Sequence, residues 1–167
     1  ERGDHQTAVE CLKIILEDRP YEGAMRFFNG LAHANLGEYD NALKELKKAY
    51  QVNDEDVVVK FYYDYMQDLV DGKGDYYNIM PFKYVKELPE KISKEWEAWI
   101  VALSLKPERI DSVLKRAMGK RKIEWGLRYG KSEIMRNSVY ILSLSKSAYA
   151  KKLILDLLLD PECGEEL

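Results

Sequence analysis

The stretch from Gly23 to Asp54 has the pattern of two helices joined by a tight turn, and it constrains the fold more than any other stretch of the chain. Residues recur at helical spacing and resume that spacing after Gly37: Phe28, Leu31, Ala32 and Asn35, then Ala42, Leu43, Leu46 and Ala49. A glycine between two such runs marks the point where one helix ends and the chain reverses. Small residues at Gly30 and Ala42 let two backbones approach closely. The stretch therefore predicts an antiparallel helix pair.

The same pattern repeats along the chain. A shift of 34 residues places Gly3 on Gly37, Ala8 on Ala42 and Leu12 on Leu46. Neither helix of a pair can bury its apolar stripe alone, so repeated pairs must stack. The chain thus resembles the tetratricopeptide repeat family, whose motif has glycine, an aromatic residue and alanines at the positions held here by Gly30, Tyr39, Ala42 and Ala49.

This resemblance covers one full unit and half of the preceding one, and fades after about residue 70 in a degenerate unit that begins near Val57. The chain departs from the family motif at three positions of the full unit. An early aromatic residue is replaced by Arg26, a leucine by Asn29 and a terminal proline by Asp54.

The sequence of the C-terminal part also predicts a series of short helices. Trp96, Trp99, Ile100 and Leu103 share one face, a second pattern ends at Gly119, and Ser132 and Ser147 are placed to cap later helices. Pro81 and Pro89 bracket a short segment that we expect to be helical. The ending, Leu153–Glu162, resembles a HEAT-type repeat. Short linkers between such helices enforce antiparallel neighbours.

The sequence therefore predicts an all-α solenoid of stacked antiparallel helix pairs. Residues 1–78 would form tetratricopeptide-like repeats with a truncated first unit, and residues 79–167 HEAT-like repeats with a truncated last unit. We expect the solenoid to continue beyond both ends.

The family resemblance implies a binding face, because the first helices of successive units line the concave side of such solenoids. The positions that hold ligands there fall on Phe27, Leu31 and Asn35 in the full unit, and on Phe61, Tyr65 and Asp68 in the degenerate one. This face would be apolar and aromatic. It therefore favours an extended or helical apolar peptide over a terminal carboxylate, and the implied function is a protein-interaction scaffold.

A structural interpretation of the same residues stays open. Residues 61–84 hold eight of the chain's 19 aromatic side chains, and rings of this kind fill irregular joints between helical stacks. If the Tyr76–Tyr84 segment folds back over the face, it leaves no open groove.

Charge is unevenly distributed and suggests a second hypothesis. Residues 1–75 carry 16 acidic and 9 basic side chains, whereas residues 115–136 hold eight Lys and Arg against two Glu. Five of these cations lie near Trp125 and Tyr129 in the sequence and could contact the phosphate backbone of a nucleic acid: Lys120, Arg121, Lys122, Arg128 and Arg136. The net charge of −3 argues against nucleic acid as the main partner. A third hypothesis is a regulatory arm of a larger enzyme.

No residue pattern indicates catalysis. The sequence lacks a phosphate-binding glycine loop, a Cys-x-x-Cys pair and histidines at metal spacing, and a zinc site from His5, Cys11 and His33 would need two helices to converge. We therefore expect no enzyme activity, cofactor or metal. Two cysteines form no bridge framework, which favours a reducing, cytoplasmic setting. Every apolar run is far shorter than the roughly 20 residues that span a bilayer. The sequence specifies neither the partner nor the oligomeric state.

Overall fold

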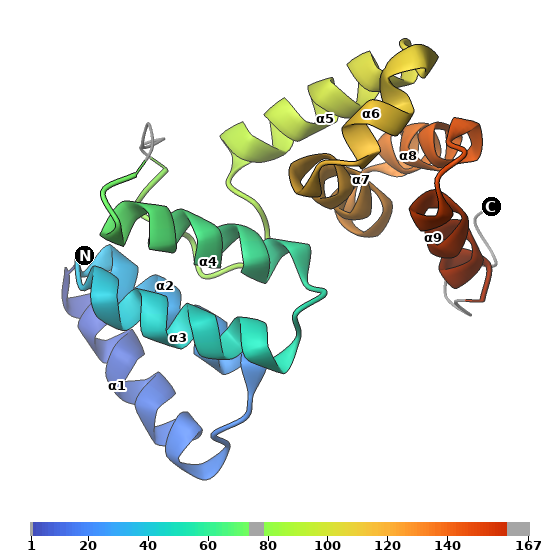
Figure 1. The fold of residues 1–167 in the computed structure, drawn as a ribbon. Helices are drawn as coiled ribbons and strands as arrows, with labels where there is room; N and C mark the ends of the chain where they lie inside the picture. The colour runs from blue at the N-terminus through green and yellow to red at the C-terminus, as the bar shows by residue number, and fades with distance from the viewer. Residues whose placement is uncertain (1, 74–78, 160–167) are drawn as a thin grey trace. The chain divides into compact units, whose positions relative to one another are not determined.

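The computed structural model describes residues 2–73 and 79–159, and these residues form helices and no strand (Figure 1). Contacts divide the chain into two compact units, Glu1–Lys91 and Ile92–Leu167. Helices that follow one another in the sequence pack against one another from α1 to α4 and from α6 to α9, as an all-α solenoid requires. The end of the predicted HEAT-like segment, residues 160–167, lies outside the described residues.

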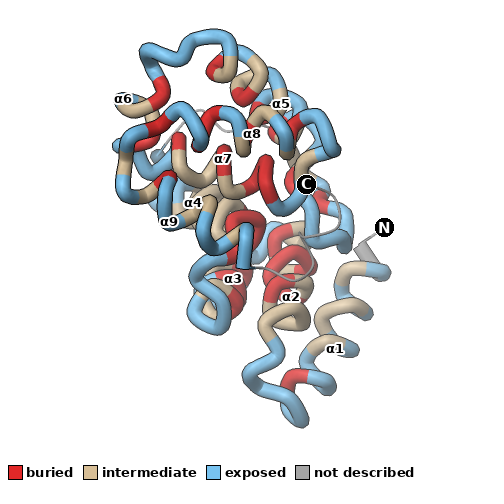
Figure 2. The backbone as a smooth tube through the Cα atoms, turned by 90° about the vertical axis from the view of Figure 1, so that its right-hand side faces the viewer, coloured by how far each residue is buried: buried red, intermediate tan, exposed pale blue. Residues whose placement is uncertain are grey.

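The first unit contains the predicted helix pair. Its helices are α1 (Arg2–Asp18), α2 (Gly23–Asn35), α3 (Tyr39–Val52) and α4 (Val57–Val70). Buried residues concentrate on α2, α3 and α4, whereas α1 is mainly half-buried or exposed (Figure 2).

Two glycines explain why α2 and α3 pair so closely. A β-carbon on Gly30 would lie 2.6 Å from Cγ of Leu46, so only glycine permits this helix approach. Gly37 has a φ of +79° in the turn, a conformation that favours glycine. Both roles agree with the sequence pattern.

The chain between α4 and the second unit is not helical, so the helix expected between Pro81 and Pro89 is wrong. We call Pro81–Leu88 the fold-back segment, because it returns along α4 as the light-green trace of Figure 1. Its backbone groups bond to side chains of α2 and α4 instead of to each other. These contacts place the segment with the first unit, although the sequence pattern assigned residues from 79 onward to the C-terminal part.

The second unit begins in the first turn of α5, and its helices form a separate core. The elements are α5 (Glu90–Ser104), η1 (Pro107–Arg109), α6 (Ile110–Leu114), α7 (Ala117–Tyr129), α8 (Ser132–Leu144) and α9 (Ala148–Leu159). The ring centroids of Trp96 on α5 and Trp125 on α7 lie 5.8 Å apart, edge to face. In the described part of the chain, no helix combines the length and the apolar character needed to cross a bilayer.

Two local expectations in this unit are wrong. Gly119 does not end a helix but lies in the first turn of α7, where a β-carbon would meet the Val113 carbonyl oxygen at 2.4 Å. This glycine permits a close approach to α6. Ser132 is the first residue of α8 rather than its cap, which falls on Lys131. The cap at Ser147 is confirmed, because its hydroxyl accepts a hydrogen bond from the Ala150 amide at 3.2 Å.

Candidate functional site: a covered groove on the first unit

The six residues expected to bind a partner lie on α2 and α4, but they differ in burial. On α2, Phe27 and Leu31 are 0% exposed, so their side chains pack in the core beneath this face. Asn35, Phe61 and Tyr65 are half-buried, and Asp68 is exposed. The face between α2 and α4 therefore offers Asn35 and the rings of α4 to whatever covers it.

Asn35 holds the backbone of the fold-back segment. Its side-chain amide donates to the carbonyl oxygen of Phe82 at 2.9 Å, and its amide oxygen accepts from the Phe82 backbone N–H at 2.7 Å. Both backbone polar groups of one residue are thus satisfied by one side chain, as they would be by a neighbouring β-strand.

The Phe82 ring packs against the aromatic side chains Tyr62 and Tyr65 of α4, which we call the ring pocket. It is 4% exposed, and its centroid lies 5.1 Å from that of Tyr62 and 5.9 Å from that of Tyr65, both near perpendicular. Tyr62 in turn contacts Phe27 of α2 edge to face at 5.2 Å. The pocket wall is therefore continuous with the core between α2 and α4, and edge-to-face pairs of this kind stabilise the ring's position.

Two further anchors fix the rest of the segment to α4. The Lys86 ammonium pairs with the Asp56 carboxylate, which is 3% exposed and whose other oxygen accepts from the Val58 and Val59 amides at 3.0 Å. Glu87 contributes its carbonyl oxygen, to which the Tyr62 hydroxyl donates at 3.0 Å. Burial, with the nearby Glu87 carboxylate, raises the pKa of Tyr62, so the hydroxyl stays a donor.

The remaining anchors reach α1 and the core. The Tyr84 hydroxyl lies 2.7 Å from Nδ1 of His5 on α1, and Leu88 is buried. Because Phe82 lies against the middle of α4 while Lys86 pairs with Asp56, the N-cap of that helix, the segment runs antiparallel to α4.

The fold-back interpretation is thus the one that the described residues support: residues 81–88 cover the face. Residues 76–78 of the predicted Tyr76–Tyr84 cover lie outside the described residues. Sequence reasoning missed Asp56, Tyr62 and His5 as contacts. The available signal was Asp56, which precedes an apolar helix as a capping residue does.

The second candidate surface, the basic stretch of the second unit, is partly engaged in packing. The Lys122 ammonium lies 5.0 Å from the centroid of Trp99 and 5.8 Å from that of Trp96, and burial lowers its pKa despite the neighbouring Glu95 carboxylate. Lys120 lies over the Tyr149 ring at 4.7 Å. Trp125 is 4% exposed and so presents no ring for base stacking.

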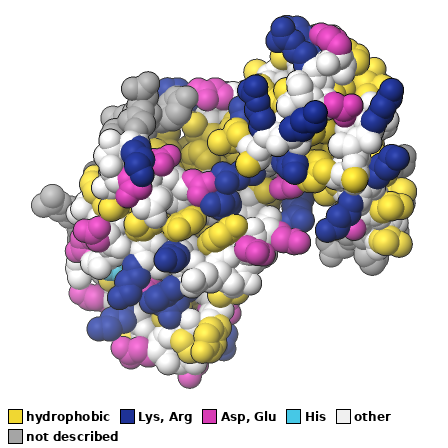
Figure 3. Space-filling model, in the orientation of Figure 1, with side chains coloured by type: hydrophobic (Ala, Val, Ile, Leu, Met, Phe, Trp, Pro, Cys, Tyr) yellow, Lys and Arg dark blue, Asp and Glu magenta, His cyan; other side chains and the backbone are white. Residues whose placement is uncertain are grey.

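The other cations of this stretch differ in exposure. Arg121 is half-buried, whereas Arg128 and Arg136 are exposed. On the face shown in Figure 3, the Lys and Arg side chains of α5–α9 are scattered among acidic and hydrophobic ones rather than joined in one continuous patch.

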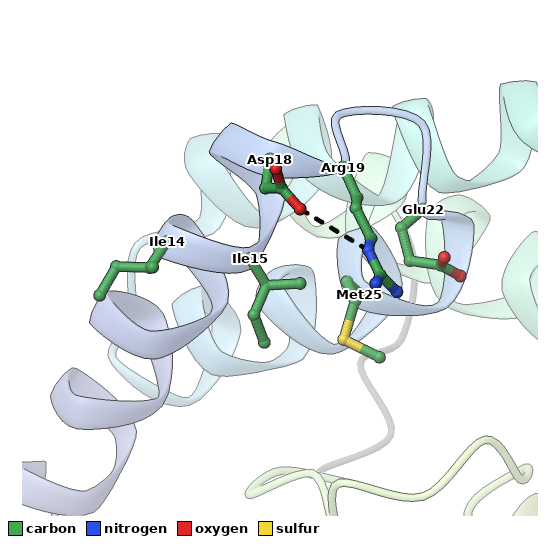
Figure 4. A pocket seen from close by; sticks show the side chains of 6 residues that line it. All are labelled: Ile14, Ile15, Asp18, Arg19, Glu22 and Met25. Atoms are coloured by element: carbon green, nitrogen blue, oxygen red, sulfur yellow. Dashed lines mark ion pairs between the residues drawn. The ribbon is translucent and has the colours of Figure 1, made fainter.

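An open pocket of about 650 Å³ lies where α1 ends and α2 begins (Figure 4). Ile14, Ile15 and Met25 supply its apolar part, and Glu22 and an ion pair between Asp18 and Arg19 at 3.8 Å supply its charged rim. Both members of this pair are largely exposed, so the pair adds little stability.

The side chains considered for zinc lie in other contacts. His5 bonds to Tyr84, and Nδ1 of His33 lies 2.6 Å from the Glu38 carboxylate, whose pKa this hydrogen bond lowers. Cys11 is a free, exposed thiol. Within residues 2–73 and 79–159, no group of three His, Cys, Asp or Glu side chains converges in a way that would hold a metal ion.

Comparison with known proteins gives no match: no family model, no curated protein and no solved structure corresponds to this chain. The groove therefore has to be interpreted from its own contacts.

Proposed function

We propose that the chain is a non-catalytic protein-interaction scaffold of the tetratricopeptide type, whose groove between α2 and α4 binds a peptide of a partner protein. The observation that carries the proposal is the pairing of the Asn35 amide with both backbone groups of Phe82. A side chain that recognises main-chain groups accepts many sequences, while the adjacent ring pocket adds selectivity.

The same pairing favours an extended peptide over a helix as the ligand. In a helix the N–H and C=O groups are bonded within the helix and point in opposite directions along its axis. Asn35 needs both groups of one residue facing the same way, which an extended residue provides. The pocket formed by Tyr62 and Tyr65 then fits an aromatic or large apolar side chain.

A scaffold role also fits the titratable groups with shifted pKa values. Tyr62 bonds to the fold-back segment, Tyr149 donates to the Glu124 carboxylate at 2.7 Å, and Glu45 bridges two cations. Each of these groups holds helices or segments together. The exposed thiol of Cys11 is compatible with a reducing, cytoplasmic setting.

A peptide-display selection tests the proposal. A random peptide library is selected in parallel against the wild-type chain and against Phe82→Ala, so that a covered groove does not hide binding. Selected peptides should share an aromatic position, and their affinity should fall about tenfold in Asn35→Leu, which removes one to two hydrogen bonds.

The control for this selection is Asn41→Ala, which alters an exposed amide on α3 and should leave affinity unchanged. Circular dichroism and thermal melting establish that each variant is folded. If neither bait enriches peptides, or if Asn35→Leu binds the enriched peptides as well as wild type does, the groove is not a peptide site.

Binding of nucleic acid through Lys120, Arg121, Lys122, Arg128 and Arg136 stays a prediction with weaker support. Contacts to tryptophan and tyrosine rings already hold Lys120 and Lys122. A salt titration with single-stranded oligonucleotides distinguishes the two functions, since phosphate contacts weaken steeply with log salt and an apolar groove does not. The regulatory-arm hypothesis is compatible with either ligand.

A further inference from the structure

The fold-back segment contacts the first unit in the manner of a bound peptide. Alternate residues face the helices: the Phe82 ring enters the pocket, Tyr84 reaches His5, Lys86 pairs with Asp56 and Leu88 is buried. Tyr84 and Lys86 remain partly exposed while they make these contacts, whereas the intervening side chains, Lys83, Val85 and Glu87, are exposed. This spacing of two residues is the pattern by which a groove reads every second side chain of a non-helical ligand.

The residues that shape the groove also have contacts of their own. Phe27, beneath the pocket, is held by its contact with Tyr62 and by the packing of α2 against α3. Asp56 is oriented by two amides of α4. Because neither set of contacts involves the segment, we infer that the ring pocket and the buried carboxylate stay in place when the segment leaves.

Charge sets the kind of partner that fits. The groove's own buried carboxylate, Asp56, is neutralised by Lys86 of the segment. A ligand that replaces the segment without a cation leaves a buried carboxylate unpaired, which is strongly unfavourable. A basic side chain four residues after the aromatic one restores the pair.

The geometry points to an intramolecular ligand: the fold-back segment occupies the groove in competition with a partner protein. The partner presents an extended peptide with an aromatic residue at the Phe82 position and Lys or Arg four residues later. This inference rests on the proposed peptide-binding function and adds the ligand pattern and its regulation. Because a tethered ligand has an effective concentration on the order of millimolar, the segment lowers the apparent affinity for the partner.

The test uses a fluorescently labelled peptide with the sequence IMPFKYVKELP, which is that of residues 79–89, and measures its anisotropy with the full chain. We expect Phe82→Ala to bind this peptide at least about tenfold more tightly than wild type, because the competing ring is gone. Lys86→Gln is a milder variant that leaves every groove residue intact and should show a smaller gain in affinity. Lys83→Ala, an exposed position in the same segment, should behave as wild type.

Changes in the peptide give the matching set of controls. Replacing its phenylalanine by alanine should abolish binding, and replacing its second lysine by glutamate should weaken binding at least about tenfold, because two carboxylates then face each other. Thermal melting shows which variants are folded, and Lys86→Gln keeps the test decisive if Phe82→Ala unfolds.

Three outcomes overturn the inference. Equal affinity of wild type and the folded variants means that the segment does not compete, and absence of binding to the folded variants means that it is not a ligand. Concentration-dependent dimers of wild type that the peptide dissociates mean that the occupant is a second copy of the chain. If library peptides still bind the groove in each case, the proposed function stands while this inference fails.

Discussion

Asn35 and Phe82 are joined by two hydrogen bonds of 2.9 and 2.7 Å, although they lie 47 residues apart in the sequence. This pairing connects the last turn of α2 to the fold-back segment and fixes the register of that segment along α4. It also gives the most direct prediction, because Asn35 acts on backbone groups alone.

Replacing Asn35 by leucine should lower the free energy of unfolding by about 2 kcal/mol. The substitution keeps the volume of the side chain but leaves the N–H and C=O of Phe82 without partners. Urea denaturation followed by circular dichroism measures the change. Asn41→Ala serves as the control and should shift stability by less than about 0.5 kcal/mol. Equal stability of Asn35→Leu and wild type would show that the pairing is dispensable.

Gly30→Ala should destabilise the first unit by about 2 kcal/mol, since the new β-carbon would lie 2.6 Å from Cγ of Leu46 and the helices would have to move apart. The double variant Gly30→Ala/Leu46→Ala should be more stable than the sum of the two single effects, because the alanine at 46 makes room for the methyl group. Additive effects in this double-mutant cycle, measured by denaturation, would contradict the close approach.

Asn29→Leu should stabilise the chain by about 1 kcal/mol. The Oδ1 atom of Asn29 is buried and accepts no hydrogen bond from any described residue, so leucine removes an unfavourable buried polar group. Differential scanning calorimetry should show a higher melting temperature. A lower one would mean that the amide oxygen is satisfied in solution.

Glu45 predicts a pH dependence of stability. Burial raises its pKa, but hydrogen bonds from Lys48 and Arg26 outweigh burial and hold the pKa below its ordinary value of 4.5. Because the unfolded chain binds this proton more readily, the stabilisation is fully present above the ordinary value and declines as the pH falls through the folded-state pKa. Glu45→Gln should therefore be less stable than wild type at neutral pH, and the difference should narrow toward about pH 3.

Denaturation of both proteins at successive pH values checks this expectation. Asp40→Asn, at an exposed carboxylate on the same helix, provides the matched control and should give a smaller difference at neutral pH. A gap between Glu45→Gln and wild type that stays constant as the pH falls would rule out the ion-paired carboxylate as its cause.

The helix pair was predictable from sequence because its determinants are local. Gly30 and Gly37 have roles that follow from their neighbours in the chain, and the helical spacing of α2 and α3 needs no distant partner. The prediction that a helix ends at Gly119 was wrong because a glycine that permits close helix packing cannot be told from a helix-ending glycine by sequence alone. The two roles are distinguished here by the position of Val113, which packs against Gly119 in the structure.

The groove was predicted only in part, because its cover depends on distant contacts. Asn35 and Tyr65 were identified through the family resemblance, but their partner in the structure is Phe82, which the prolines at 81 and 89 placed in an expected helix. Phe82, Tyr84 and Leu88 stand at alternate positions, but Val85 and Lys86 break the alternation of apolar and polar residues, so the sequence carries no clear period of two. The burial of Asp56 could not be inferred, since it requires Lys86 to arrive from outside the helix.

Asp56 performs two tasks with one carboxylate: one oxygen caps the first turn of α4, and the other receives the Lys86 ammonium. The charge of the occupant of the groove therefore affects the hydrogen bonds from the Val58 and Val59 amides to Asp56, which cap the first turn of α4. An occupant without a cation removes this ion pair and leaves the carboxylate with its two amide donors, so the strength of those hydrogen bonds should change with the occupant. We therefore expect the hydrogen-exchange rates of the Val58 and Val59 amides to depend on which ligand occupies the groove.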